Sequence, residues 1–485
     1  SGDPQHDKVI IWTRVTPDTA GPVPVRWILA RNRELTDIVK TGVYDATEAR
    51  DYTVKIDVTG LRAGAPYFYG FRAGQAESAI GKTKTLPRRN VEQVKIAVAS
   101  CASYSHGFFN AYKSISERDD LDAVIHLGDY IYEYGLDGYG GAIGLRLGRV
   151  LQPEVECVSL ADYRQRHAQY KREPELQAAH AVAPWIVVWD DHETANDLWS
   201  TGAENHSESE GQFAARKQAA LQAYYEWMPI RDPQPGRAFE AINRSFQFGD
   251  LFTLIMVETR LLARTEPLDY ATQMPLRMQR WNFTSETSAV ALRDHEADTP
   301  AMRRLPAIYE EVGEELRPVL DWRRADGLVR QARDLPDGFF LAPDIDAINE
   351  ALNAPDRQLI GEAQEQWLAQ ELSRSKDETL AAIAAKAVKE MAYHVRHTGE
   401  WTIRLGDGKN VGLLIIRDRP PRLPRPDRRG RSLQAPSHRA DAAAELHLPG
   451  NLVPCRIDDA NGLGSDRTCE QVRTVRRQID IVNLA

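Results

Sequence analysis

The chain has 485 residues, of which 42% are hydrophobic and 27% charged, a composition typical of a globular protein with two or three domains. The formal net charge of -9 argues against nucleic-acid binding as a main role. No apolar run approaches the ~20 residues that a membrane-spanning helix needs, so we expect no membrane span.

Residues 1–88 are predicted to form an all-β domain. Runs rich in β-branched and aromatic residues, separated by turn residues, predict strands at Lys8–Val15, Val23–Ala30, Tyr52–Val58 and Pro66–Ala73. The turn that leads into Tyr67 and Tyr69 is typical of an immunoglobulin-like or fibronectin-like sandwich. No catalytic pattern stands out in this part, which favours a packing role.

From about residue 91, strands alternate with long helical patterns, which predicts an α/β domain. Helices are expected at Phe108–Asp119, Leu160–Val182 with a break at Pro174, Gly211–Met228 and Arg357–Leu372. A strand at Leu251–Val257 leads to Arg260, which we expect to pair with a carboxylate or to steady an anionic substrate. The glycine-rich residues 135–151 lack GxxxxGK[ST] and predict a flap at a site entrance.

Side chains that can bind metals follow three of the predicted strands. Val94–Ser100 leads to Cys101, and Ala123–His126 leads through Gly128 to Asp129 and Tyr132. Trp185–Trp189 leads to the cluster Asp190, Asp191, His192 and Glu193. A single aspartate at a strand end is by default a turn former or helix cap. Because ligands bind outside the carboxyl ends of strands in open α/β sheets, three such ends together predict a metal site.

The motifs, taken in this order, resemble the PhoD-type alkaline phosphatases. They are SGDP and WTRV near the start, ASC at 99–101, GDYIYE at 128–133, WDDHE at 189–193 and LIGEAQEQWL at 359–368. That family belongs to the metallophosphoesterases related to purple acid phosphatases, and it includes phospholipase D-like and phosphotriesterase-like members. The resemblance covers roughly residues 1–373.

The resemblance implies a β-sandwich at 1–88, a four-layer αββα metallophosphoesterase domain at 89–373, and a divergent C-terminal part of that domain at 374–485. It also implies Fe³⁺ with Ca²⁺, or another divalent metal, beside it. Cys101, Asp129 and Tyr132 would hold the iron, Asp129 would bridge to the second metal, and Asp191 would take a further ligand position. The catalytic residues would be Asp191, His192 close to the phosphate, and Asn196 as a further phosphate contact.

The chemistry of the donors agrees with that assignment. Thiolate and phenolate suit a trivalent ion, and carboxylate oxygens suit calcium. We therefore predict hydrolysis of phosphate monoesters or diesters by direct attack of metal-bound hydroxide, without a phosphoenzyme. Each residue also has a structural alternative: Cys101 as a small buried hydrophobe, Tyr132 as a hydrogen-bonded core residue, and His192 as a structural histidine.

The second half of the family's site, a strand ending in Gly-Asp-x-His, is not found. The most similar segment is Leu405–Lys409, which has Lys409 where the histidine is expected. The segment Arg417–Arg439 contains eight arginines and five prolines, a composition typical of a solvated segment. Three explanations stay open: divergence, ligands from another segment, or a shifted reading frame. We favour the last, because helical and strand patterning fades abruptly there.

Two alternative functions stay open beside the phosphoesterase. One is a phospholipase D-like or phosphotriester hydrolase on the same site, and the other is a non-catalytic metal-binding protein on a decayed phosphatase fold. Members of the resembled family are exported, so we expect a periplasmic or secreted protein, although the chain opens on polar residues without a signal peptide. Cys455 and Cys469 could pair in such a compartment. The sequence predicts no oligomeric state.

Overall fold

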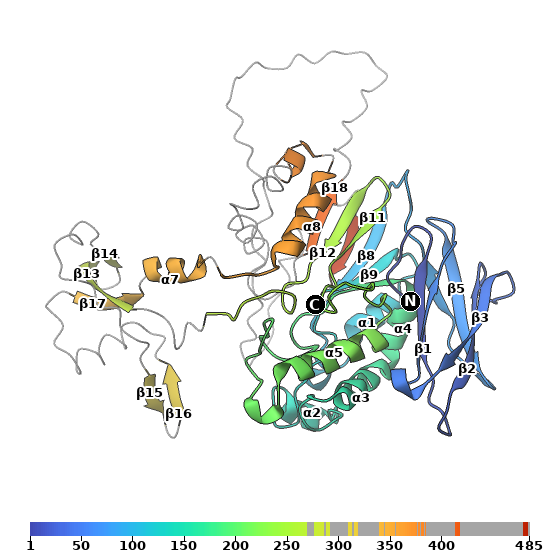
Figure 1. Cartoon of the computed structure of the whole chain (residues 1–485), viewed down its shortest axis with the longest axis horizontal. Coiled ribbons are helices and arrows are strands. Elements are labelled where there is room, and N and C mark those ends of the chain that lie inside the picture. Colours follow the sequence, from blue (N-terminus) through green and yellow to red (C-terminus); the bar gives the residue numbers. More distant parts are fainter. Residues whose placement is uncertain are drawn as a thin grey trace, which may run out of the picture.

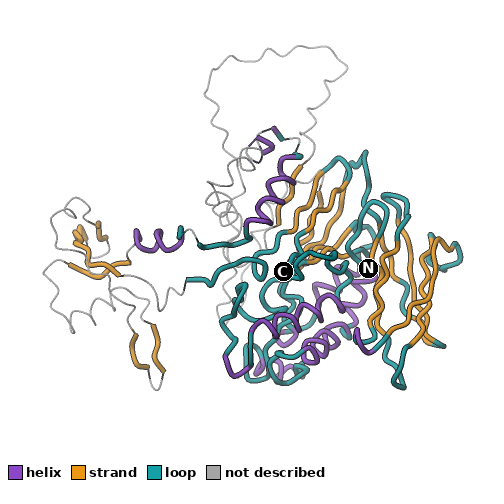
Figure 2. Tube along the Cα trace, viewed as in Figure 1, coloured by secondary structure: helices purple, strands orange, loops and turns teal. Residues whose placement is uncertain are grey.

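A computed structural model describes residues 1–268, most of 345–384, and short strands within 276–343, 413–417 and 479–483 (Figures 1 and 2). Three predictions fall on residues that the structure does not describe. They concern the partial motif at Leu405–Lys409, the arginine-rich segment after Arg417, and the pair Cys455 and Cys469.

The N-terminal part is an antiparallel β region, drawn in blue in Figure 1. Strand β1 (Val9–Arg14) pairs with β4 (Thr53–Val58). A second sheet has the strand order β3 (Ile38–Ala46), β2 (Val23–Ala30) and β5 (Pro66–Ala73). Strands β6 (Ala76–Glu77) and β7 (Gly81–Lys84) both pair with β5. A short 3-10 helix, η1 (Glu48–Arg50), precedes β4. All four predicted strands are confirmed. The prediction missed β3, because its side chains are mostly exposed and lack a clear apolar alternation.

The second part is a mixed α/β region, as predicted, and it contains a parallel sheet. The order is β10 (Trp185–Val187), β9 (Ala123–His126), β8 (Val94–Ala99) and β19 (Ile479–Asn483), with every pair parallel. A second, antiparallel sheet joins β11 (Arg244–Phe248), β12 (Phe252–Met256) and β18 (Leu413–Arg417). Further antiparallel pairs join β13 (Leu276–Ser285) to β14 (Ser288–Ala291) and β17 (Phe339–Pro343), and β15 (Tyr309–Val312) to β16 (Glu315–Pro318).

The helices largely follow the sequence pattern. They are η2 (Tyr104–His106), α1 (Asn110–Ser116), α2 (Gly141–Leu147), α3 (Leu160–Lys171), α4 (Pro174–Val182), η3 (Glu208–Glu210), α5 (Phe213–Trp227), α7 (Ile345–Leu352) and α8 (Glu362–Ser373). Pro174 opens α4, the position where its missing N–H costs nothing, so the predicted break is confirmed. None of the helices within the described ranges is both long and apolar enough to cross a membrane.

The glycine-rich residues 135–151 contain the short helix α2, and their role as a flap stays a prediction. One local prediction was wrong. Helix α8 begins at Glu362, not at Arg357, because Gly361 has φ +77° and breaks the helical backbone there.

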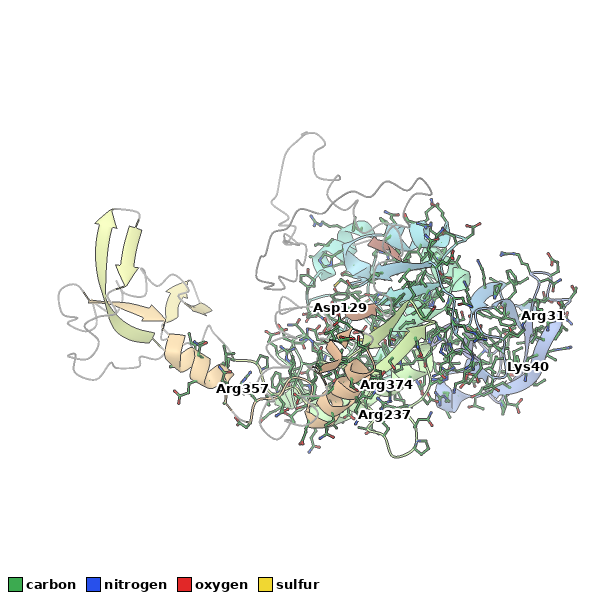
Figure 3. All side chains as sticks on the ribbon, turned by 90° about the horizontal axis from the view of Figure 1, so that it is seen from above. Arg31, Lys40, Asp129, Arg237, Arg357 and Arg374 are labelled. Carbon is green, nitrogen blue, oxygen red and sulfur yellow. The ribbon has the colours of Figure 1, made fainter. Side chains whose placement is uncertain are left out.

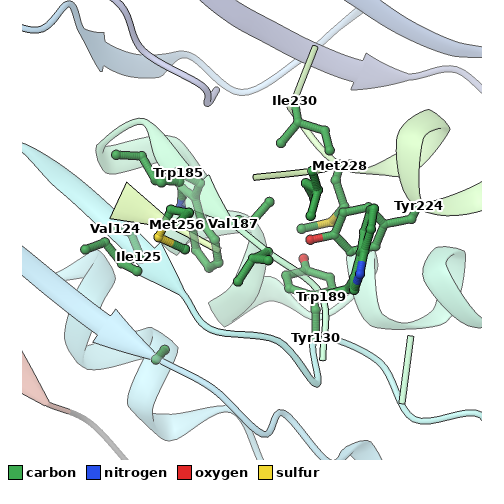
Figure 4. Close-up of a cluster of buried hydrophobic side chains, with 14 of the residues drawn as sticks. Val124, Ile125, Tyr130, Trp185, Val187, Trp189, Tyr224, Met228, Ile230 and Met256 are labelled. Carbon is green, nitrogen blue, oxygen red and sulfur yellow. The ribbon is translucent and has the colours of Figure 1, made fainter. Parts of the chain in front are cut away.

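The core of the α/β region lies between β9, β10 and α5 (Figure 4). The side chains of Ile125, Trp185, Val187, Trp189 and Tyr224 are each 2% exposed or less. An interior packed this closely holds the ends of the strands in fixed positions. The first residues of the turns that follow β9 and β10 are therefore held in place by the core.

Residues at the start of the chain join the β region to the α/β region. Gly2 N donates to Ile10 O at 2.9 Å, and Asp3 N donates to Trp185 O at 2.8 Å, so one short segment bonds to both β1 and β10. Farther along the same boundary, Arg231 Nε pairs with Asp57 Oδ2 at 2.8 Å. These bonds hold the β region and the α/β region against each other.

Candidate metal centre

The candidate site lies where the carboxyl ends of β8, β9 and β10 meet. Cys101 N donates to Gly128 O at 3.2 Å, and Ala102 N donates to Asp129 O at 2.8 Å, which joins the turns after β8 and β9. Val188 N donates to His126 O at 3.1 Å and joins β10 to the same edge. Figure 3 shows Asp129 within the body of the α/β region. Three distant stretches of sequence thus converge.

Ligand atoms of Asp129, Asp191 and His192 all lie within 4.8 Å of one another. Tyr132 Oη donates to Asp129 Oδ2 at 3.0 Å, and its ring stacks on His192 with centroids 4.2 Å apart. The thiol of Cys101 lies close enough to Asp129 and Tyr132 for both side chains to affect its pKa. Five of the six predicted site residues are therefore neighbours.

Asn196 is the predicted residue that the structure does not bring into this group. Its side-chain Nδ2 donates to Glu204 Oε2 at 2.7 Å, and its backbone N donates to Glu133 Oε1 at 2.7 Å. The side-chain amide and the backbone N–H of Asn196 thus both bond to glutamates of the protein. The Asn196 amide nitrogen carries two N–H donors, so the bond to Glu204 leaves one of them for a substrate oxygen.

The residues present fit a metal ion. Asp129 Oδ1 is buried and has no hydrogen-bond partner among the described residues, a costly position for a carboxylate oxygen unless a cation meets it. Burial raises the pKa of Asp129. Loss of water, followed by the charge of Asp129, raises the pKa of the Cys101 thiol to about 12. A bound cation reverses this effect, because it favours the ionised carboxylate and deprotonates a coordinating thiol.

The backbone is strained where it presents these side chains. Cys101 has φ +57° and Asp129 has φ +53°, the left-handed region that non-glycine residues rarely adopt. Each such residue costs roughly 1–3 kcal/mol and persists where the surroundings enforce it, commonly at functional sites. The two strained residues are therefore consistent with a functional role for these turns.

Glu193 joins the turns after β9 and β10, a role that the sequence did not indicate. Its carboxylate accepts from the backbone N of Asp129 at 3.1 Å, of Tyr130 at 2.7 Å and of Asp190 at 2.9 Å. The sequence shows only that a glutamate follows His192 and gives no sign that it turns away from the metal group. Its function here is to fix the distance between the two sets of ligands.

Glu133 orients His192 and was also missed. Its Oε2 lies 2.9 Å from His192 Nδ1, and its Oε1 accepts from Asn205 Nδ2 at 2.7 Å. A carboxylate on Nδ1 fixes the tautomer and the ring plane, so Nε2 is the nitrogen left for a ligand or substrate. The one available signal was its place directly after Tyr132 in GDYIYE.

Arg260 pairs with a carboxylate, one of the two roles expected for it. Its Nε lies 2.6 Å from Asp190 Oδ1, and its Nη2 lies 3.5 Å from Asp191 Oδ1. Burial raises the pKa of Asp191, but Arg260 and then His192 outweigh it and leave that pKa below its usual value. Burial raises the pKa of Asp190 to about 7 in spite of Arg260. Of the two neighbouring aspartates, Asp191 is thus the one whose ionised form the surroundings favour.

Glu133→Gln is expected to lower the pKa of His192 in the metal-free protein. Burial alone would lower that pKa, but Glu133 raises it from 6.5 to about 10. Protonated His192 therefore stabilises the fold fully below pH 6.5, and this contribution is lost as the pH rises toward 10. NMR titration of ¹³C-labelled histidine would report the change, and an unaltered His192 pKa in the variant would contradict the pairing.

The chain matches two family models. Residues 1–87 match "PhoD-like phosphatase, N-terminal domain", and residues 96–410 match "PhoD-like phosphatase". The second match runs beyond residue 373, where we had expected the resemblance to end, so that limit was wrong.

Individual relatives agree with these matches. The chain is 40% identical to "Alkaline phosphatase D" of Bacillus subtilis (strain 168) over 271 residues, 54% of this chain and 46% of the relative. A solved structure described as "Structure of PhoD" is 31% identical, with a TM-score of 0.56, over 77% of this chain and 58% of that one. The chain thus spans about half the length of these relatives.

The two family matches divide the chain as the fold does. Strands β1 to β7 fall within the first match, and the second match begins inside β8, the first strand of the parallel sheet. The second match alone covers more than half of the chain, including every residue of the candidate metal centre. The chain belongs to the PhoD-like phosphatase family.

Proposed function

We propose that the protein is a metal-dependent phosphoesterase that hydrolyses phosphate monoesters or diesters. The observation that carries the proposal is the close grouping of Asp129, Asp191 and His192, with Tyr132 on Asp129. Membership of the PhoD-like phosphatase family supports a phosphate ester as the substrate. The activity of the whole protein is part of the proposal, since the chain spans about half of its relatives.

The proposed metals are Fe³⁺ and Ca²⁺, with another divalent ion as an alternative to calcium. Cys101, Asp129 and Tyr132 would hold the iron, and Asp129 and Asp191 would hold the divalent ion. The donor types support this division, because thiolate and phenolate favour iron while carboxylates favour calcium. When bound, the two cations would activate a water molecule and neutralise charge on the phosphoryl oxygens.

The chain's own residues would orient the substrate. His192, fixed through Nδ1 by Glu133, would donate from Nε2 to a phosphoryl oxygen or to the leaving oxygen. Its raised pKa supports a proton at that nitrogen. Arg260 would keep Asp191 ionised, and Asn196 would contact the phosphate through the amide N–H that does not bond to Glu204.

The finer architecture and location are proposed with the function. The parallel sheet of β8, β9, β10 and β19 and the antiparallel sheet of β11, β12 and β18 support a four-layer αββα domain. The family matches at 1–87 and 96–410 support a domain boundary near residue 88, after an immunoglobulin-like or fibronectin-like sandwich, with 374–485 as the C-terminal part of the catalytic domain. A periplasmic or secreted location rests on the resemblance alone.

The second candidate is a non-catalytic metal-binding protein. The observation that favours it is in the sequence, where no Gly-Asp-x-His motif follows residue 373. A site with half of its ligands would bind metal weakly and turn over slowly, so metal content and activity together separate the two candidates.

Metal analysis and hydrolysis assays test the proposal. We expect about one iron per chain, together with calcium, and turnover of p-nitrophenyl phosphate or its bis-ester, since a bimetallic site of this kind serves both. Cys101→Ser should lose the iron and the activity, while Cys157→Ala, a change at a buried cysteine outside the site, should keep both. Metal without turnover would favour the non-catalytic candidate. Equal activity in Cys101→Ser would remove Cys101 from the site.

A further inference from the structure

Residues 359–368, which carry the motif LIGEAQEQWL, pack against the end of the strand that leads to Arg260. Ile360 and Leu368 form one buried cluster with Ile255 of β12 and with Val257, which follows that strand (Figure 1). Helix α8 begins within the motif, so the motif places this helix beside the residues that leave β12.

The side-chain amide of Gln364, in α8, bonds to both backbone groups of Glu258. Its Oε1 accepts from Glu258 N at 2.7 Å, and its Nε2 donates to Glu258 O at 2.7 Å. Both residues are buried. Because an amide offers a donor and an acceptor side by side, this pair of bonds fixes the position and the direction of the chain at Glu258.

The carboxylate of Glu258 joins the segment after β10 to the turn that carries Arg260. It accepts from four N–H groups, which are Trp189 Nε1 at 2.9 Å and the backbone N of Arg260 at 2.9 Å, of Leu261 at 2.7 Å and of Leu262 at 2.7 Å. Trp189 directly precedes Asp190 in the chain. One carboxylate therefore sets the distance between Arg260 and the aspartates that follow Trp189.

The guanidinium of Arg260 extends from this turn to the aspartates of the metal centre. Its Nε lies 2.6 Å from Asp190 Oδ1, and its Nη2 lies 3.5 Å from Asp191 Oδ1. N–H donors already contact both oxygens of Glu258, and among the described residues this carboxylate forms no ion pair, so it does not draw the guanidinium back. The guanidinium can keep its place between the aspartates only where its own backbone stays fixed.

We propose that Glu258 is a positioning residue, which acts on the metal centre through Arg260. Its four hydrogen bonds keep the guanidinium of Arg260 beside Asp190 and Asp191. Gln364 acts one step farther away, by holding the backbone of Glu258. Groups that bond to metal ligands fix the orientation of those ligands. The expected effect on metal affinity rests on the proposed function, whereas the effect on the position of Arg260 does not.

Hydrogen exchange of the Arg260 Nε–H, measured by ¹⁵N NMR on the metal-free protein, tests the position of the guanidinium. The signal is assigned by its absence from Arg260→Lys. Glu258→Gln leaves at least one of the four N–H groups without an acceptor, so we expect exchange to become about tenfold faster or more. Glu266→Gln, the same change at an exposed position eight residues along the chain, should leave the signal unaltered. Unaltered exchange in Glu258→Gln would overturn the proposal.

Calorimetric titration of the iron-loaded protein with calcium chloride tests the effect on the metal centre. Glu258→Gln should weaken calcium binding by about tenfold or more, the loss that is common when a group behind a metal ligand is removed. In an Arg260→Gln background, the same change should alter the affinity by no more than about twofold, because Glu258 acts through Arg260. Equal effects in both backgrounds, as a purely structural role would give, would overturn the proposal. Absence of calcium binding in the unaltered protein would contradict the proposed metals, and the Arg260 signal alone then decides.

A second variant keeps the test decisive if Glu258→Gln does not fold. Gln364→Leu leaves every charge in place and removes only the amide that holds the backbone of Glu258. We expect exchange of the Arg260 Nε–H to become about threefold faster or more. Gln366→Leu, at an exposed position on the same helix, should leave it unaltered. If Gln364→Leu exchanges no faster than Gln366→Leu, the proposal is wrong.

Discussion

Asp129→Asn is expected to lower the turnover of p-nitrophenyl phosphate by about 10³-fold or more. The buried oxygen Oδ1 lacks a protein partner among the described residues, and the neighbouring Oδ2 accepts from Tyr132, so this carboxylate is the one most clearly directed at a cation. Metal ions at such sites supply several kcal/mol of charge stabilisation, and each 1.36 kcal/mol corresponds to about tenfold in rate. An amide of the same shape keeps the packing but loses the charge, so metal content should fall with activity.

A matched control separates this effect from a general change of charge. Asp137→Asn makes the same chemical change at an exposed position eight residues along the chain, and it should keep both metal and turnover. The unfolding midpoint of the metal-free Asp129→Asn protein should not fall, because the variant relieves a buried charge. Retained activity in Asp129→Asn would mean that the reaction does not depend on this carboxylate.

Gly128→Ala is expected to lower the free energy of unfolding by about 3 kcal/mol, through strain and overpacking together. Gly128 has φ +106°, and a Cβ built on it would lie 2.4 Å from Asp190 N and 2.5 Å from Asp190 Cβ. The obstacle is mainly backbone, which cannot move aside as a flexible side chain would. The turns after β9 and β10 would have to separate, and metal content should fall with stability.

Gly74→Ala is the matched control for that experiment. Gly74 also has a positive φ, +58°, but a Cβ there would meet nothing within 4 Å. It should cost only the conformational strain, about 1 kcal/mol. Chemical denaturation of both variants gives the difference. Equal losses would mean that the close approach of Gly128 to Asp190 contributes nothing to stability.

The elements and the residues at their ends could be predicted because their signals are local. An apolar run followed by glycine and aspartate marks both the end of a strand and its direction, so Asp129 and Asp191 were found from a few letters each. Strand β3 and the start of α8 were missed for the converse reason. One lacks an apolar face, and the other depends on the backbone angle of a single glycine.

The residues that hold the site in shape could not be predicted. Glu193 and Glu133 stand beside the proposed ligands in the sequence, and by residue type alone they are equally able to bind metal. What distinguishes them is where their carboxylates point, toward backbone N–H groups and toward His192 Nδ1. The direction of each carboxylate is set by tertiary packing between segments some sixty residues apart. The hydrophobic periodicity of a sequence contains only local information, so it does not reveal such contacts.

The three hydrogen bonds that Glu193 accepts place a limit on what can stand at that position. An aspartate would carry the same charge on an arm one methylene shorter, and it could not span from Asp190 to the amides of Asp129 and Tyr130. Reach, rather than charge, is therefore the property that this position requires. Because that span ties the two turns to each other, we expect thermal motion to change the spacing of their oxygen donors less than it would if the turns moved separately.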